Sequence, residues 1–140
     1  MRRGAPLPAQ IEERLATLGA ILAPEPAVKF AYVFGGAGRG VLHPLSDVDV
    51  AVYLDEAVDP VQARIDLIGV VTKHLGTDEL DLVVLNRAPT ALLGRILQSR
   101  KVIVDKEPFL RHRFESLALR TFLDFRIFER RFLDTRFARG

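Results

Sequence analysis

The stretch from Val28 to Leu54 constrains the fold of this chain more than any other part of the sequence. It contains two segments rich in β-branched and aromatic residues, Val28–Phe34 and Val48–Leu54, and such segments are typical of strands. A glycine-rich turn, Gly35–Gly40, follows the first segment, and the motif Asp47-Val48-Asp49 opens the second. The two expected strands are therefore joined by a connection that carries both glycines and carboxylates.

The remaining segments alternate between helical and strand patterns. Asp59 and Pro60 are typical of a helix start, and Gly76 of a helix end. The predicted elements are helices over Pro8–Leu22, Pro60–Leu75, Thr90–Ser99 and Glu107–Phe137, with further strands over Leu80–Leu85 and Lys101–Val104. We expect an α/β (α+β) fold with a small mixed sheet flanked by helices and a long C-terminal helix.

Length and composition favour one soluble domain. The chain has 140 residues, and a domain usually needs ~100–200. No apolar run approaches the ~20 residues that cross a bilayer, and no apolar segment follows the basic N-terminus as in a signal peptide. Cysteine is absent, which excludes disulfides and thiolate metal sites. We expect a cytoplasmic protein with a catalytic core over about 1–106 and a C-terminal helix over about 107–137.

The C-terminal segment differs from the rest in charge and in aromatic content. Residues 1–110 carry a net charge of −2, whereas residues 111–140 carry +4 and six of the nine phenylalanines. Seven apolar residues recur there at helical spacing: Phe114, Leu117, Ala118, Phe122, Phe125, Phe128 and Phe132. This apolar stripe either packs on the protein's own core or contacts a partner, since interfaces favour aromatic residues and arginine.

The acidic residues form the pattern that most clearly indicates a functional site. Asp47 and Asp49 should point to the same side of a strand, because strand side chains alternate. If the next strand pairs beside theirs, Asp81 completes a group of three carboxylates. Such oxygens select Mg²⁺, and three of them can hold two ions. Each motif alone also fits an interpretation without function. Asp47 and Asp49 would then be a solvated strand end, and Asp81 would be a charge at a strand edge.

The glycine turn complements the carboxylates. Glycine lacks a Cβ, so the backbone N–H groups of Gly35 and Gly36 can approach phosphate oxygens closely, and Arg39 could reach a phosphate as well. A helix after the turn would add a favourable dipole. The segment does not match a Walker loop or a dinucleotide-binding fingerprint, because the residues after Gly40 break both patterns. By itself, the glycine-rich segment also fits an ordinary turn after a strand, with no ligand.

In order and spacing, these motifs resemble those of the DNA polymerase β superfamily of nucleotidyltransferases. That signature is a strand ending in Gly-Gly or Gly-Ser, about ten residues, Asp-x-Asp and a third Asp on a later strand. Gly35-Gly36, Asp47-Val48-Asp49 and Asp81 match it. The short length, Ser46 before Asp47 and the long C-terminal helix resemble one branch, the minimal nucleotidyltransferase (MNT) antitoxins of HEPN–MNT toxin–antitoxin systems.

The resemblance implies a polymerase β-like fold and a specific activity. Members bind ATP and Mg²⁺ and transfer AMP to a tyrosine of a partner HEPN ribonuclease toxin, which silences it. It implies that Asp47, Asp49 and Asp81 are catalytic and bind Mg²⁺, with two ions expected. It also implies that Gly35, Gly36, Arg39 and Ser46 bind the nucleotide. Nucleic acid is not expected as a direct partner.

One departure from the branch concerns the second glycine. MNT proteins usually have Gly-Ser where this chain has Gly35-Gly36. The missing hydroxyl removes one bond to the triphosphate, worth roughly 0.5–1.5 kcal/mol or up to about tenfold in affinity. Since the wider superfamily also uses Gly-Gly, we expect weakened or altered nucleotide binding rather than none.

Three hypotheses follow from the sequence. The first is an antitoxin that transfers AMP. The second is an antitoxin that acts by binding and occlusion, with a vestigial site. The third is a nucleotidyltransferase for a small molecule or a nucleic acid, although 140 residues leave little room for a separate acceptor-binding domain.

Overall fold

The computed structural model of the chain describes residues 6–40 and 47–138. Its helices and strands correspond closely to the segments expected from the sequence. In chain order they are α1 (Ile11–Ala16), α2 (Leu18–Leu22), β1 (Val28–Phe34), α3 (Gly35–Arg39), β2 (Val48–Leu54), α4 (Pro60–Leu75), β3 (Leu80–Val84), the 3₁₀ turn η1 (Leu85–Arg87), α5 (Thr90–Ser99), β4 (Lys101–Asp105) and α6 (Pro108–Ala138).

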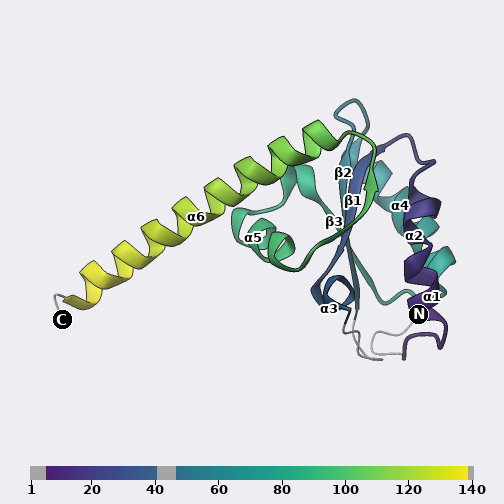
Figure 1. Cartoon of the computed structure of the whole chain (residues 1–140), viewed down its shortest axis with the longest axis horizontal. Helices are drawn as coiled ribbons and strands as arrows, with labels where there is room; N and C mark the ends of the chain where they lie inside the picture. The colour runs from purple at the N-terminus through teal and green to yellow at the C-terminus, as the bar shows by residue number, and fades with distance from the viewer. Residues whose placement is uncertain (1–5, 41–46, 139–140) are drawn as a thin grey trace.

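The four strands form one mixed sheet in the order β3-β2-β1-β4 (Figure 1). β1 lies antiparallel to both β2 and β4, whereas β2 and β3 run parallel. A parallel pair needs a crossover connection, and α4 supplies it. The predicted small mixed sheet flanked by helices is confirmed.

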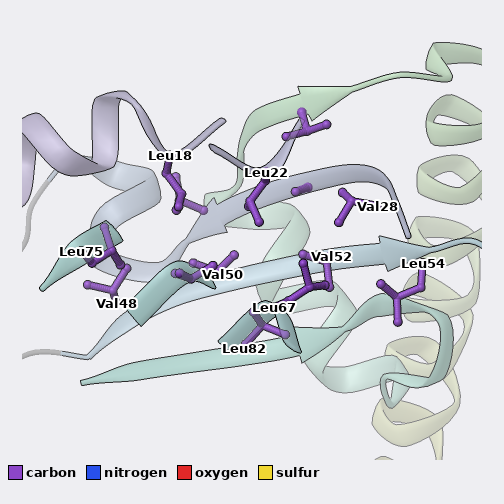
Figure 2. Close-up of a cluster of buried hydrophobic side chains, with 14 of the residues drawn as sticks. Leu18, Leu22, Val28, Val48, Val50, Val52, Leu54, Leu67, Leu75 and Leu82 are labelled. Carbon is purple, nitrogen blue, oxygen red and sulfur yellow. The ribbon is translucent and has the colours of Figure 1, made fainter. Parts of the chain in front are cut away.

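Helices cover both faces of this sheet, so its central strands are buried on two sides (Figure 1). On one face, α1, α2 and α4 enclose an aliphatic core that includes Leu22, Val50 and Leu67 (Figure 2). On the other face, α5 and the first part of α6 cover aromatic side chains of β1, among them Phe30 and Tyr32. Burial of apolar side chains on both faces is the main stabilising contribution to the fold, at about 0.8 kcal/mol for each buried methylene group.

The first helix is broken, whereas the sequence predicts one helix over Pro8–Leu22. The break lies at Thr17, between α1 and α2. The Thr17 hydroxyl donates to the carbonyl oxygen of Arg14 (3.1 Å), and the same Oγ1 lies 2.9 Å from Nε2 of His74 on α4. Because this contact joins residues 57 positions apart, the local apolar spacing could not reveal it.

Two smaller differences concern the glycine turn and the third strand. Gly35–Arg39 is a five-residue helix rather than an irregular turn. The strand predicted over Leu80–Leu85 ends one residue early, because η1 begins at Leu85. There the Asn86 side chain accepts a hydrogen bond from the Leu54 N–H (2.8 Å) and donates to the Leu54 carbonyl oxygen (2.9 Å), which ties η1 to the end of β2.

α6 is one continuous helix of 31 residues, and only its first part packs on the sheet (Figure 1). Phe114 joins the aromatic core, and Ala118 is buried. Farther along, Phe125, Phe128 and Phe132 have exposed fractions of 42%, 68% and 54%. The apolar stripe thus divides: its first part packs on the protein's own core, and its outer part faces solvent. Among the described residues, no helix is both long and apolar enough to cross a membrane.

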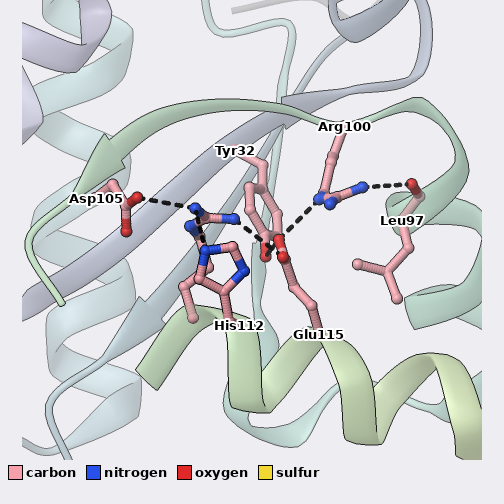
Figure 3. A network of polar contacts seen from close by, with 7 residues as sticks. Tyr32, Leu97, Arg100, Asp105, His112 and Glu115 are labelled. Atoms are coloured by element: carbon pink, nitrogen blue, oxygen red, sulfur yellow. Dashed lines mark hydrogen bonds and ion pairs between the residues drawn. The ribbon is translucent and has the colours of Figure 1, made fainter. Parts of the chain in front are cut away.

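A polar network attaches the start of α6 to the sheet (Figure 3). Glu115 of α6 accepts hydrogen bonds from the Tyr32 hydroxyl (2.6 Å) and from Arg100 Nε (2.8 Å). Arg111 bridges Glu115 and Asp105, each at 3.0 Å. Burial alone would raise the pKa of Glu115, but hydrogen bonds from Arg100 and Tyr32 hold that pKa below its ordinary value. The network therefore orients α6 relative to β1 and β4.

Candidate active site

The three acidic residues lie at one end of the sheet. Asp49 of β2 and Asp81 of β3 are direct partners in the parallel register of these strands. Strand alternation places Asp49 on the face of Ala51 and Asp81 on the face of Val83. Ala51 belongs to the core beneath α5, and Val83 packs against that core. Asp47 lies two residues before Asp49. The expected pairing of the third strand beside the second is confirmed.

Asp49 is the carboxylate that its surroundings affect most. Its pKa is raised to about 6, mainly by burial and further by the negative charges of Asp81 and Asp47. Arg95 of α5 opposes this shift and makes the smallest of the four contributions. Like charges held close together disfavour ionisation unless a cation neutralises them. The surroundings of Asp49 therefore favour the binding of either a proton or a metal cation.

The chemistry of the donor set fits Mg²⁺. Carboxylate oxygens are hard ligands, and Mg²⁺ takes one or two of them together with water and phosphate oxygens. In the part of the chain that the structure describes, no three acidic, histidine or cysteine side chains are arranged closely enough to hold a metal ion. Paired strands lie about 4.8 Å apart, so rotation of the exposed Asp81 side chain would bring its oxygens toward those of Asp49.

The first glycine of the turn is packed against Asp49. Phe34, the last residue of β1, pairs with Asp49 across the antiparallel β1–β2 register. Gly35 follows with φ of +61°, in the left-handed region that favours glycine. A Cβ on Gly35 would overlap Oδ2 of Asp49. Glycine is thus required here both by the backbone conformation and by the adjacent carboxylate.

Two residues of α5 complete these surroundings, and no sequence motif predicted a role for either of them. The Gly35 N–H donates to Oγ of the buried Ser99 (2.9 Å), and that hydroxyl donates to the carbonyl oxygen of Arg95 (3.3 Å). A Cβ on Gly38 would overlap the Ser99 carbonyl oxygen. No local motif marks Ser99 or Arg95, because α5 reaches the glycine helix only through tertiary packing.

The other predicted nucleotide-binding residues are less closely grouped. Gly36 is half-buried next to Gly35, whereas Arg39 is exposed at the far end of α3. Ser46 lies outside the described residues. The structure therefore brings Gly35, Gly36 and the three carboxylates to one end of the sheet, with Arg39 about one helical turn away.

A cavity of about 470 Å³ lies near α3 but does not contain the carboxylates. It is lined by residues of α1, α2, α3 and β4 that include Glu12, Gly19, Ala37 and Lys101. It also contacts Val33, whose side chain belongs to the aliphatic core on the opposite face of the sheet from Asp49. We therefore do not place the candidate site in this cavity.

The sequence matches a known family over most of its length. The model of the family described as "Polymerase beta, Nucleotidyltransferase" matches residues 16–109. That range contains the whole sheet, the glycine helix and all three acidic residues. No curated protein is a significant match to the sequence.

Several solved structures share the fold. A toxin–antitoxin structure with AMP-PNP has a TM-score of 0.69 at 23% identity and covers 90% of this chain and 98% of that chain. A mutant toxin–antitoxin complex of MntA has a TM-score of 0.71 at 21% identity, covering 88% and 98%. A tri-AMPylated Shewanella oneidensis HEPN toxin in complex with an MNT antitoxin has a TM-score of 0.66 at 20% identity, covering 90% and 98%. These likenesses establish the fold.

Proposed function

Because this chain belongs to the polymerase beta nucleotidyltransferase family, we propose that it transfers AMP from ATP to a tyrosine hydroxyl of a partner HEPN ribonuclease toxin. The transfer would neutralise the toxin, and the chain would act as its antitoxin. The observation that carries the proposal is the register of Asp49 opposite Asp81, directly beside Gly35.

In this proposal Asp47, Asp49 and Asp81 hold Mg²⁺. When bound, the ion or ions neutralise phosphate charge and favour the ionised form of the attacking hydroxyl. The raised pKa of Asp49 supports the assignment, because a cation would relieve the repulsion among the three carboxylates. A free tyrosine has a pKa of about 10, so its hydroxyl needs such activation near neutral pH.

The nucleotide would lie along the glycine helix. We assign its phosphates to backbone N–H groups near Gly35 and Gly36, with Arg39 and Ser46 as further contacts. The Gly35 N–H already donates to Ser99, so its main role would be to hold the turn in place. The close fit of Gly35 against Asp49 supports placing the phosphates between the glycines and the carboxylates.

The partner assignment draws on the solved structures of the same fold. One of them is a complex of a tri-AMPylated HEPN toxin with an MNT antitoxin, and another contains AMP-PNP. On this chain we assign the outer part of α6 to partner contact, because Phe125, Phe128 and Phe132 are exposed there among arginines. This exposed aromatic surface also favours the second candidate function, an antitoxin that acts by occlusion alone.

The test is to mix the protein, ATP and Mg²⁺ with the product of the neighbouring gene, which the proposal expects to be the HEPN toxin, and to measure the mass of that product. The proposal expects a gain of one or more AMP units, and the double variant Asp47→Asn with Asp49→Asn should abolish the gain. Asp66→Asn is a suitable control, because it removes an exposed carboxylate from the outer face of α4.

The outcomes separate the candidate functions. A stable complex without a gain of mass would favour occlusion. Transfer of AMP at the wild-type rate by the double variant would refute the assignment of the site. No complex and no transfer would favour an acceptor of another class, a small molecule or a nucleic acid.

A further inference from the structure

The helix α5 presents a different set of residues to each of its neighbours. Ile96 is buried in the aromatic core against the sheet. Gly94 lies against the ring of Phe122 on α6, where a Cβ would overlap that ring. Arg95 and Ser99 are four residues apart and therefore share a face, and Ser99 contacts the glycine helix α3. The face that carries Arg95 is thus the one turned toward the candidate site.

The backbone of Arg95 is held near the carboxylates by close contacts. Ser99 accepts from the Gly35 N–H (2.9 Å) and donates to the Arg95 carbonyl oxygen (3.3 Å). Gly38 packs so tightly on the Ser99 carbonyl oxygen that only glycine fits there. Because Gly35 in turn contacts Asp49, a continuous set of contacts joins the backbone of Arg95 to the acidic group.

The guanidinium of Arg95 is available for a ligand. Its side chain is exposed, and in the described residues it forms no hydrogen bond or ion pair. Its positive charge nevertheless acts on Asp49. An arginine that is near a group of carboxylates but not paired with any of them is suited to bind an anion that arrives with its own cations, because its planar fork matches phosphate oxygens.

We propose that Arg95 forms an anion-binding subsite for the β- and γ-phosphates of the nucleotide, the part that leaves as pyrophosphate. This subsite rests on the function proposed above. In the transfer, the acceptor oxygen bonds to the α-phosphorus and its proton passes to water. The bond from the α-phosphorus to the α–β bridging oxygen breaks, and pyrophosphate leaves with that electron pair. Arg95 stabilises the charge that grows on this leaving group.

The test measures binding of three probes in the presence of Mg²⁺ by calorimetry: ATP, AMP and inorganic tripolyphosphate. Arg95→Ala should weaken the binding of ATP and of tripolyphosphate by about 10- to 100-fold, as expected for a lost charge-assisted hydrogen bond. The affinity for AMP should change by less than about twofold. Arg95→Lys should recover part of the loss. Arg87→Ala is the matched control, because it removes an exposed arginine beyond the opposite end of β3 from Asp81 and should change none of the three affinities.

Each outcome bears on a different statement. If wild-type protein binds all three probes and Arg95→Ala binds them equally well, the subsite is refuted while the proposed function stands. Equal weakening of ATP and AMP would also refute it, because Arg95 would then act on the α-phosphate or on the carboxylates. If wild-type protein binds neither ATP nor tripolyphosphate, both the subsite and the proposed function fail. Thermal melting of each variant verifies that it is folded.

Discussion

Replacement of Gly35 by alanine tests the central contact of the site, and Gly40 provides an internal control. Both glycines have positive φ, +61° and +74°. A Cβ on Gly35 would overlap Asp49 Oδ2, whereas a Cβ on Gly40 would meet nothing within 4 Å among the described residues. The two alanine variants therefore share the backbone strain, and only the variant at Gly35 also displaces a carboxylate.

The magnitudes follow from these two contributions. An L-residue in the left-handed region costs about 1–2 kcal/mol, and the stiffer unfolded chain offsets about 0.4–1 kcal/mol of that cost. Gly40→Ala should therefore lower the free energy of unfolding by about 1 kcal/mol. Gly35→Ala should lower it by a further 1–3 kcal/mol or so, which is typical of overpacking, because Asp49 must move or the β1–β2 register must distort.

The assay combines urea unfolding with AMP transfer to the proposed HEPN partner. Gly40→Ala should retain transfer, while Gly35→Ala should lose most of it under conditions where the protein is still folded. If the two variants were equally stable and equally active, the packing of Gly35 against Asp49 would have no functional importance.

Three other changes should give measurable effects. The pKa of Asp49 is raised to about 6 from an ordinary 3.8, so the folded state holds the Asp49 proton more tightly than the unfolded state does. The free energy of unfolding should therefore fall by about 1–2 kcal/mol as pH rises from about 4 to 6, after allowance for solvent screening. Asp49→Asn should remove this decrease when urea unfolding is measured over the same pH range. Gly94→Ala should cost about 1–3 kcal/mol in urea unfolding, because its Cβ would overlap the ring of Phe122. Tyr32→Phe should cost about 0.5–1.5 kcal/mol in the same assay, because Glu115 loses one buried hydrogen bond but keeps its arginine partners.

Contrary results would be equally informative. A stability profile that rises between pH 4 and 6 in the wild type, and is flat in Asp49→Asn, would reverse the inferred sign of the Asp49 contribution. Gly69→Ala, on the exposed side of α4 with no described atom within 4 Å, should be neutral or stabilising. If Gly94→Ala behaved in the same way, α5 and α6 would not be in tight contact at that point.

The sequence was sufficient where the determining interactions are local. The helix α4 begins and ends as predicted, because Asp59 accepts a hydrogen bond from the Val61 N–H (3.1 Å) and Gly76 adopts φ of +74°. These signals depend on residues only a few positions away. The same holds for the strand β1, whose β-branched and aromatic residues favour an extended backbone.

Proximity between distant segments was decided by the tertiary structure. The acidic motif predicted three site residues, but only the parallel register of β2 and β3 places Asp81 opposite Asp49. At the break, Thr17 contacts His74 of α4, and Arg95 and Ser99 lie near the glycine helix because α5 packs against it. A periodic pattern shows which side of a helix or strand is apolar, but it carries no information about which other segment will cover that side. Which segment covers it depends on the arrangement of the whole chain that buries the most apolar surface.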